Sequence, residues 1–227
     1  MRSGRALFGL ALALALALTA CQQPADAAET AVTAPAAQRI ARESGLRTAI
    51  FAGGCFWGVE GVFSHMRGVT SAVSGYHGGS ARTADYESVG AGGTGHAEAV
   101  KVTYDPAVVR YDQLLRVFFS VVADPTTLNA QGPDRGTQYR SALVPMDAEQ
   151  RAVATAYLAQ IGAAGLWSRP IVTRIEAYRR FYPAEAYHQD FMARNPRNPY
   201  ILRWDAPKLE AFRTLYPGLY RKAFVTG

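Results

Sequence analysis

The chain has 227 residues, a formal net charge of +6 and a hydrophobic content of 49%. Its basic residues are spread out and do not form the runs that mark nucleic-acid-binding surfaces. Only two cysteines are present, which excludes a small fold held together by several disulfides. The chain after its first 45 residues is long enough for one domain with a substantial core.

The first residues have the pattern of a bacterial export signal. Arg2 and Arg5 precede an apolar run from Ala6 to Leu18, and small residues come before Cys21. The run is too short for a membrane-spanning helix with this flank. The stretch "LTAC" also resembles a lipobox, in which Cys21 carries the lipid; a cleaved signal peptide without lipid is the alternative. Lipidation predicts an exported cell-envelope protein, anchored to the membrane and facing the periplasm.

We therefore expect three segments: a signal peptide at 1–20, a flexible tether at 21–45 and one domain at 46–227. The residues after Cys21 are rich in alanine, glutamine, proline and threonine and lack apolar periodicity, which is typical of a tether. If Cys21 carries lipid, Cys55 is the lone thiol of the domain and has no partner for an internal disulfide.

The patterns along the domain predict strands and helices in a regular order. They predict a strand at 48–53, a helix from Cys55 to Gly68, strands at 69–79 and 96–106, a helix at 111–122, a strand at 139–146, a helix at 147–162 and a strand at 170–177. Residues 123–138, between the helix at 111–122 and the strand at 139–146, form a long polar loop of the kind that is usually functional or mobile.

This order is that of a split β-α-β unit, so we expect an α/β (α+β) fold. It is a ferredoxin-like sandwich with its two crossover helices on one face of the sheet. The tail at 178–227 is rich in tyrosine, proline and arginine. We expect an extended C-terminal segment with short helices that wraps around the domain.

Cys55 stands at the start of the first predicted helix, directly after Gly53 and Gly54. The unpaired N–H groups and the dipole at a helix start favour an anion, and the thiolate is the nucleophilic form of cysteine. This position indicates a reactive thiol. The alternative is a small, buried, apolar cysteine.

Phe56 and Trp57 follow the cysteine, although the helix already has an apolar stripe at Val59, Val62 and Phe63. Two rings beside a reactive sulfur can form an apolar cage for a small group such as a methyl on sulfur. Simple core packing is the alternative.

Glu98 lies near the start of the predicted strand at 96–106, with His96 on the same side. A half-buried carboxylic acid has a raised pKa and can donate a proton, whereas a solvated glutamate at a strand edge is the alternative. Tyr86 and Tyr139 supply hydroxyl donors that can hold an oxygen atom.

The histidines do not have the spacing of metal ligands, and no cysteine pair accompanies them. We therefore expect no metal. The four are His65, His77, His96 and His188.

Five ordered blocks together resemble the A-type peptide methionine sulfoxide reductases. They are "GCFWG" at 54–58, "GYHGG" at 75–79, "TGHAEAVKVTYDP" at 94–106, "QGPDRGTQYRS" at 131–141 and "AEAYHQDF" at 184–191. The resemblance implies that Cys55 attacks the sulfoxide sulfur and that Glu98 protonates the oxygen, which Tyr86 and Tyr139 hydrogen-bond. The implied product is methionine plus a sulfenic acid on Cys55.

The resemblance also assigns the surrounding residues. Phe56 and Trp57 hold the S-methyl group, and Asp134 and His188 support the site from outside it. We also expect His96 to support the site from outside it. The substrate implied is the S epimer of methionine sulfoxide, free or in proteins, and no cofactor is needed.

One departure concerns recycling. Many relatives carry resolving cysteines in the C-terminal tail, whereas residues 178–227 contain none. The chain resembles the single-cysteine branch, so an external small thiol or a thioredoxin-like partner is the expected reductant. Cys21 could resolve only in an unlipidated form. With an export signal, the implied role is repair of oxidised envelope proteins.

Other functions remain open on the sequence. A cysteine-dependent hydrolase or acyltransferase would pair Cys55 with His96 or His188 and would need an oxyanion hole. A thiol peroxidase, in which Cys55 would reduce a peroxide, is a second enzymatic alternative. An envelope lipoprotein that binds methionine without catalysis is the non-enzymatic alternative.

Overall fold

The computed structural model describes residues 31–227. Its main sheet has six strands in the order β7-β6-β1-β3-β2-β8. Neighbouring strands are antiparallel except β6 and β7, which are parallel. The strands are β1 (Arg47–Gly53), β2 (Val69–His77), β3 (Ala97–Tyr104), β6 (Ser141–Val144), β7 (Arg174–Ile175) and β8 (Phe181–Pro183).

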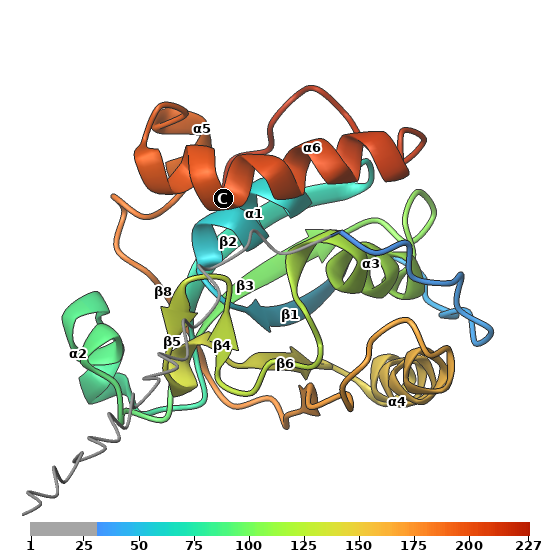
Figure 1. The fold of residues 1–227 in the computed structure, drawn as a ribbon, viewed down its shortest axis with the longest axis horizontal. Helices are drawn as coiled ribbons and strands as arrows, with labels where there is room; N and C mark the ends of the chain where they lie inside the picture. The colour runs from blue at the N-terminus through green and yellow to red at the C-terminus, as the bar shows by residue number, and fades with distance from the viewer. Residues whose placement is uncertain (1–30) are drawn as a thin grey trace, which may run out of the picture.

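The four central strands confirm the predicted split β-α-β fold. Helix α1 (Phe56–Ser64) connects β1 to β2, and α3 (Tyr111–Val117) lies between β3 and β6. The larger core lies between these helices and one face of the sheet, where Phe51, Val100 and Val102 are fully buried. Figure 1 shows α6 (Ala206–Leu215) lying along α1 on its outer side. Within residues 31–227, no helix has the length and apolar character that crossing a membrane requires.

Several elements differ from the prediction. Helix α3 ends at Val117 and continues as a π-helical turn, Phe118–Val122, and the strand predicted at 170–177 is reduced to β7. Helix α2 (Tyr86–Ala91) was not predicted, because it is short and lacks an apolar stripe. It begins where the Asp85 side chain accepts a hydrogen bond from the Ser88 backbone N–H, at 2.9 Å.

The loop at 123–138 and the C-terminal tail contain short elements. The loop holds the two-residue strands β4 (Ala130–Gln131) and β5 (Asp134–Arg135) and the 3-10 turn η3 (Thr137–Tyr139). The tail holds β8, α5 (Phe191–Arg194), a π-helical turn at Ile201–Asp205 and α6. The expected wrapping segment is confirmed, and its last helix is longer than the sequence pattern suggested.

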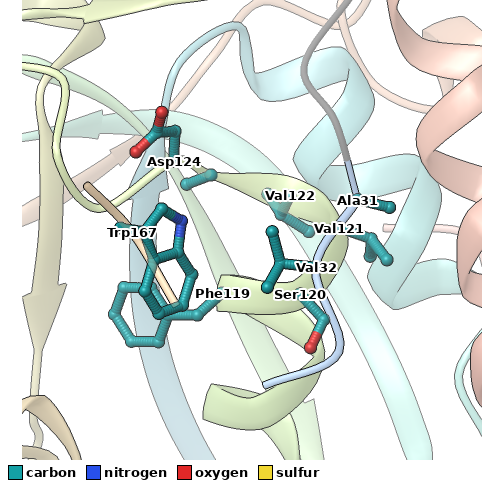
Figure 2. Close-up of a pocket in the computed structure, with 9 residues that line it drawn as sticks. Ala31, Val32, Phe119, Ser120, Val121, Val122, Asp124 and Trp167 are labelled. Atoms are coloured by element: carbon teal, nitrogen blue, oxygen red, sulfur yellow. The ribbon is translucent and has the colours of Figure 1, made fainter. Parts of the chain in front are cut away.

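The segment 31–45 is packed on the domain, which is a correction to the predicted flexible tether. Ala34 is fully buried, and its backbone N–H donates to the Ser120 hydroxyl at 3.0 Å. Figure 2 shows Ala31 and Val32 beside the turn Phe118–Val122, next to a hollow of about 200 Å³ that Trp167 borders. These contacts are made by backbone groups and small side chains, so they leave no apolar pattern in the sequence. The predicted signal peptide and Cys21 lie outside the described residues.

Helix α1 is joined to the tail by a buried acid. Glu60 is 1% exposed, and its Oε2 accepts a hydrogen bond from the backbone N–H of Asp190 at 2.9 Å. Burial, followed by the nearby charge of Asp190, raises the pKa of Glu60 to about 8, so the acid is neutral at neutral pH. This bond holds the segment that carries His188 and Phe191 against the start of α1.

Candidate active site

A cavity of about 380 Å³ brings together the predicted catalytic and substrate-binding residues. It lies where β1 meets α1, and β3, α2, η3 and the tail contribute its other walls. Within residues 31–227, no group of three or more histidine, cysteine, aspartate or glutamate side chains is placed to hold a metal ion. The lining residues are Cys55, Phe56, Trp57, Tyr86, Glu98, Asp134, Tyr139, Asn198 and Tyr200.

Cys55 is the N-cap residue of α1 and remains partly exposed. Gly54 precedes it with a φ of 87°, and a Cβ at Gly54 would overlap the side chain of Gln131. Glycine therefore allows both the turn and the close approach of the loop that holds Gln131. The sequence placed the thiol correctly at the helix start.

The charge state of the thiol differs from the sequence-based expectation. Burial raises the pKa of Cys55 well above its ordinary value, and the charges of Glu98 and Asp205 raise it further. A hydrogen bond from the Trp57 backbone N–H lowers it but does not compensate. The helix start favours an anion, yet the cavity wall and the surrounding carboxyl groups outweigh it, so the resting form is the thiol.

Glu98 faces the helices because β3 alternates, with Glu98, Val100 and Val102 on one side of the sheet. It is 2% exposed, and its Oε2 accepts a hydrogen bond from the Phe56 backbone N–H at 3.0 Å. Burial raises the pKa of Glu98 to about 8, against the opposing effect of the Phe56 hydrogen bond. The acid therefore holds its proton at neutral pH, as the sequence predicted.

The aromatic wall has support from the tail. The Trp57 ring stacks on Phe191, with centroids 3.8 Å apart, and meets Tyr200 edge-on. Trp57 Nε1 donates to His188 Nδ1 at 3.1 Å, and the His188 ring is 5.1 Å from that of Phe56. His188 thus lies behind the wall without lining the cavity, and burial lowers its pKa.

The two predicted tyrosines line the cavity from different elements. Tyr86 begins α2 and is 37% exposed at the mouth, and its backbone N–H donates to Glu185 at 2.9 Å. Tyr139 ends η3, which Gly136 introduces with a φ of 134°. Burial raises the pKa of both tyrosines, and the charge of Glu98 raises it further in each. Both hydroxyls are therefore hydrogen-bond donors across the physiological pH range.

Asp134 and His96 have different positions. Asp134 lines the cavity and accepts a hydrogen bond of 2.5 Å from the Tyr200 hydroxyl. His96 is buried outside the cavity lining: its Nδ1 accepts from the Gly79 N–H, and its Nε2 donates to the Ser80 carbonyl. The His96 ring therefore holds the loop after β2 and does not touch the reacting groups.

Three residues of the tail near the site were not predicted from the sequence. Asn198 and Tyr200 line the cavity, and Asp205 is 1% exposed next to the first turn of α1. The fit at Asp205 requires glycine opposite, because a Cβ on Gly58 would overlap Asp205 Oδ1. No pattern in the sequence indicated that Asp205 is buried or which residues it contacts.

The cavity suits sulfur chemistry better than acyl transfer. It combines a thiol, a protonated carboxylic acid and two hydroxyl donors beside an apolar wall. No histidine is among its lining residues, and His188 Nδ1 is engaged by Trp57. A cysteine hydrolase would need an imidazole next to the thiol, which this arrangement does not provide.

Comparison with known proteins identifies the family. The family model described as peptide methionine sulfoxide reductase matches residues 47–217. The chain is 56% identical to the peptide methionine sulfoxide reductase MsrA 2 of Mesorhizobium japonicum, over 78% of this chain and 90% of that protein. It is 49% identical to the MsrA of Deinococcus radiodurans, over 74% of this chain and 81% of that protein.

Two solved structures have a similar fold. Reduced Mxr1 from Saccharomyces cerevisiae has a TM-score of 0.59 and 31% identity, covering 77% of this chain and 94% of its own. Methionine sulfoxide reductase A of Corynebacterium diphtheriae has a TM-score of 0.58 and 30% identity, covering 75% and 89%. Together with the cavity, these matches lead to one conclusion: the chain belongs to the A-type peptide methionine sulfoxide reductases, enzymes with peptide-methionine (S)-S-oxide reductase activity.

Proposed function

We propose that Cys55 reduces the S epimer of methionine sulfoxide, free or in proteins, and is itself oxidised to a sulfenic acid. The observation that carries this proposal is the placement of the Cys55 thiol and the protonated Glu98 acid on one cavity with an aromatic wall. A sulfoxide needs these groups together, because its sulfur accepts a nucleophile only as its oxygen accepts a proton.

The reaction balances without a cofactor. The Cys55 sulfur attacks the sulfoxide sulfur and forms an S–S bond, while the S–O bond breaks and the protonated oxygen leaves as hydroxide. Hydroxide then attacks the Cys55 sulfur, which breaks the S–S bond and leaves a sulfenic acid on Cys55. Methionine is released. The substrate sulfur is reduced by two electrons, and the Cys55 sulfur is oxidised by two.

Glu98 supplies a path for the proton. At neutral pH both groups hold their protons, because burial raises the pKa of Glu98 to about 8 and that of Cys55 well above its ordinary value. Glu98 donates its proton to the sulfoxide oxygen and then accepts the proton of the thiol. The acid returns to its starting state, and the thiolate forms only when a substrate oxygen is present.

The walls of the cavity account for substrate choice. Tyr86 and Tyr139 donate hydrogen bonds to the oxygen, and the rings of Phe56 and Trp57 enclose the S-methyl group. Because the sulfoxide oxygen and the S-methyl group contact different walls, the rest of the methionine extends through the opening of the cavity. Only one epimer at sulfur satisfies all three directions.

Recycling requires an external reductant. The sequence has no cysteine in 178–227 that could attack the sulfenic acid. Two thiol groups, from a small thiol or a thioredoxin-like protein, reduce the sulfenic acid back to the Cys55 thiol and yield water and one disulfide.

We also propose that the enzyme repairs oxidised proteins of the cell envelope. This proposal rests on the sequence pattern of the first 21 residues, with Cys21 as the lipid attachment site.

Mass spectrometry of the intact protein tests the chemistry directly. After one equivalent of methionine S-sulfoxide without reductant, we expect Cys55 to gain one oxygen while one equivalent of methionine forms. Cys55→Ser should form no methionine. Methionine formation with an unmodified Cys55 would contradict the proposed intermediate, and turnover of a chromogenic ester without sulfoxide reduction would favour a hydrolase.

Glu98→Gln tests the acid. We expect the rate of sulfoxide reduction to fall by at least about tenfold, since general acids contribute about 10²–10⁴-fold. Glu87→Gln, an exposed glutamate on α2, is the matched control and should retain the wild-type rate. Equal rates for Glu98→Gln and wild type, measured under single-turnover conditions, would remove Glu98 from the mechanism.

Asp205→Asn tests the control of thiol ionisation. Loss of this negative charge should lower the pKa of Cys55, because the charged thiolate is then less disfavoured. We expect iodoacetamide to alkylate Cys55 severalfold faster at pH 8, with the midpoint of the pH–rate curve moved to lower pH. Glu210→Gln, an exposed acid on α6, the helix that follows Asp205, should leave the curve unchanged. An unchanged midpoint in Asp205→Asn would show that its charge does not reach the sulfur.

Cell fractionation tests the anchor. In a bacterial host the wild-type chain should sediment with membranes, and Cys21→Ser should release it to the periplasmic fraction. Mass spectrometry of the mature N-terminus should find lipid on Cys21. An unmodified N-terminus in the wild type would leave a cleaved signal peptide as the correct interpretation.

A further inference from the structure

Two hollows of about 290 and 530 Å³ adjoin each other beside the active cavity. They share Arg140 and Glu176. The first is also lined by His77 and Arg179, and the second by Arg174 and other residues. We call the exposed face around them the arginine surface and define it by Arg174 and Arg179.

This surface is separated from the active cavity by one short turn. In η3, Tyr139 lines the cavity, whereas Thr137 and the following Arg140 line the larger hollow. Consecutive Cα atoms are about 3.8 Å apart, so a few residues of extended polypeptide span this wall. A polypeptide with its methionine side chain in the cavity therefore has its flanking residues within reach of the arginine surface.

The charge of the surface comes from Arg174 and Arg179, not from Arg140. Arg140 Nε and Nη2 donate to the two oxygens of Glu176 at 2.7 and 3.1 Å. The nearby His77, with Nδ1 3.6 Å from Glu176 Oε2, and the hydrogen bonds from Arg140 outweigh burial and lower the pKa of Glu176 to about 2. The guanidinium of Arg140 is therefore already paired with a carboxylate. Arg140 also donates to the carbonyl oxygens of Thr137 and Gly95.

Arg174 and Arg179 have no such partner. Both side chains are exposed, and within residues 31–227 neither guanidinium forms an ion pair with a carboxylate. Tyr178, 49% exposed and stacked on His77, lies next to Arg179. Tyrosine and arginine are the residue types that contribute most at protein interfaces.

We propose that the arginine surface binds acidic side chains that flank the oxidised methionine of a client polypeptide. The inference rests on the proposed function and adds a preference among its substrates. A client is favoured over a protein reductant as occupant, because its methionine side chain occupies the cavity that Tyr139 lines, and Arg140, the next residue, lines both hollows. Carboxylates suit a surface that offers two exposed guanidinium groups.

Peptide kinetics with dithiothreitol as reductant test this preference. Three blocked peptides of equal length carry a central methionine S-sulfoxide flanked by glutamate, glutamine or lysine. For the wild type we expect kcat/KM to be about threefold to tenfold higher with glutamate than with glutamine flanks, and lowest with lysine. The difference should lie in KM, since remote binding is uniform, and should vanish at about 0.5 M NaCl.

The double variant Arg174→Gln/Arg179→Gln should lose the preference for glutamate and keep the wild-type rate with glutamine flanks. Arg151→Gln/Lys222→Gln removes two exposed cations that line neither hollow, and it should keep the preference. An unchanged glutamate-to-glutamine ratio in the Arg174/Arg179 variant would overturn the proposal. A defect seen only when a protein reductant replaces dithiothreitol would assign the surface to the reductant. Failure of the proposed function is distinct: the wild type would then reduce neither the glutamine peptide nor free methionine sulfoxide.

Discussion

The hydrogen bond from the Phe56 backbone N–H to Glu98 fixes the position of the Glu98 acid relative to the Cys55 thiol. It connects the acid on β3 to the first turn of α1, where Cys55 is the cap. Neither group could be moved without the other, because β1 pairs directly with β3 and leads straight into α1. The bond also satisfies one of the free N–H groups at the helix start, so it has a structural as well as a chemical role.

The tail completes what the sheet and α1 begin. Glu60 holds the backbone at Asp190, and this places Phe191 and His188 against Trp57. Further along, the Tyr200 hydroxyl bonds Asp134 and closes the cavity on the side of the loop. The substrate wall therefore depends on contacts between segments more than 100 residues apart in the chain. A substitution at Glu60 would act on the site through this packing, without touching the reacting atoms.

Burial raises the pKa of both Glu98 and Cys55, but the effect on the reactivity of each group is different. It gives Glu98 a pKa of about 8, which suits a proton donor, and it disfavours the thiolate of Cys55. A resting thiol suits a lone cysteine, because the thiolate is the form that oxidants attack. In the proposed mechanism, the thiolate forms only when a substrate oxygen takes the Glu98 proton.

The sequence by itself determined the order of the central strands and helices and the place of Cys55 at a helix start, and the family resemblance implied roles for Glu98, Tyr86 and Tyr139. Periodicity and glycine pairs are local signals, so they survive in a linear pattern. Only the tertiary structure decided that residues 31–45 pack on the domain, that Tyr200 and Asp205 reach the site and that His96 does not. These depend on backbone hydrogen bonds and on contacts between distant segments. The charge state of Cys55 was decided there too, because desolvation and neighbouring carboxyl groups exist only once the cavity has formed.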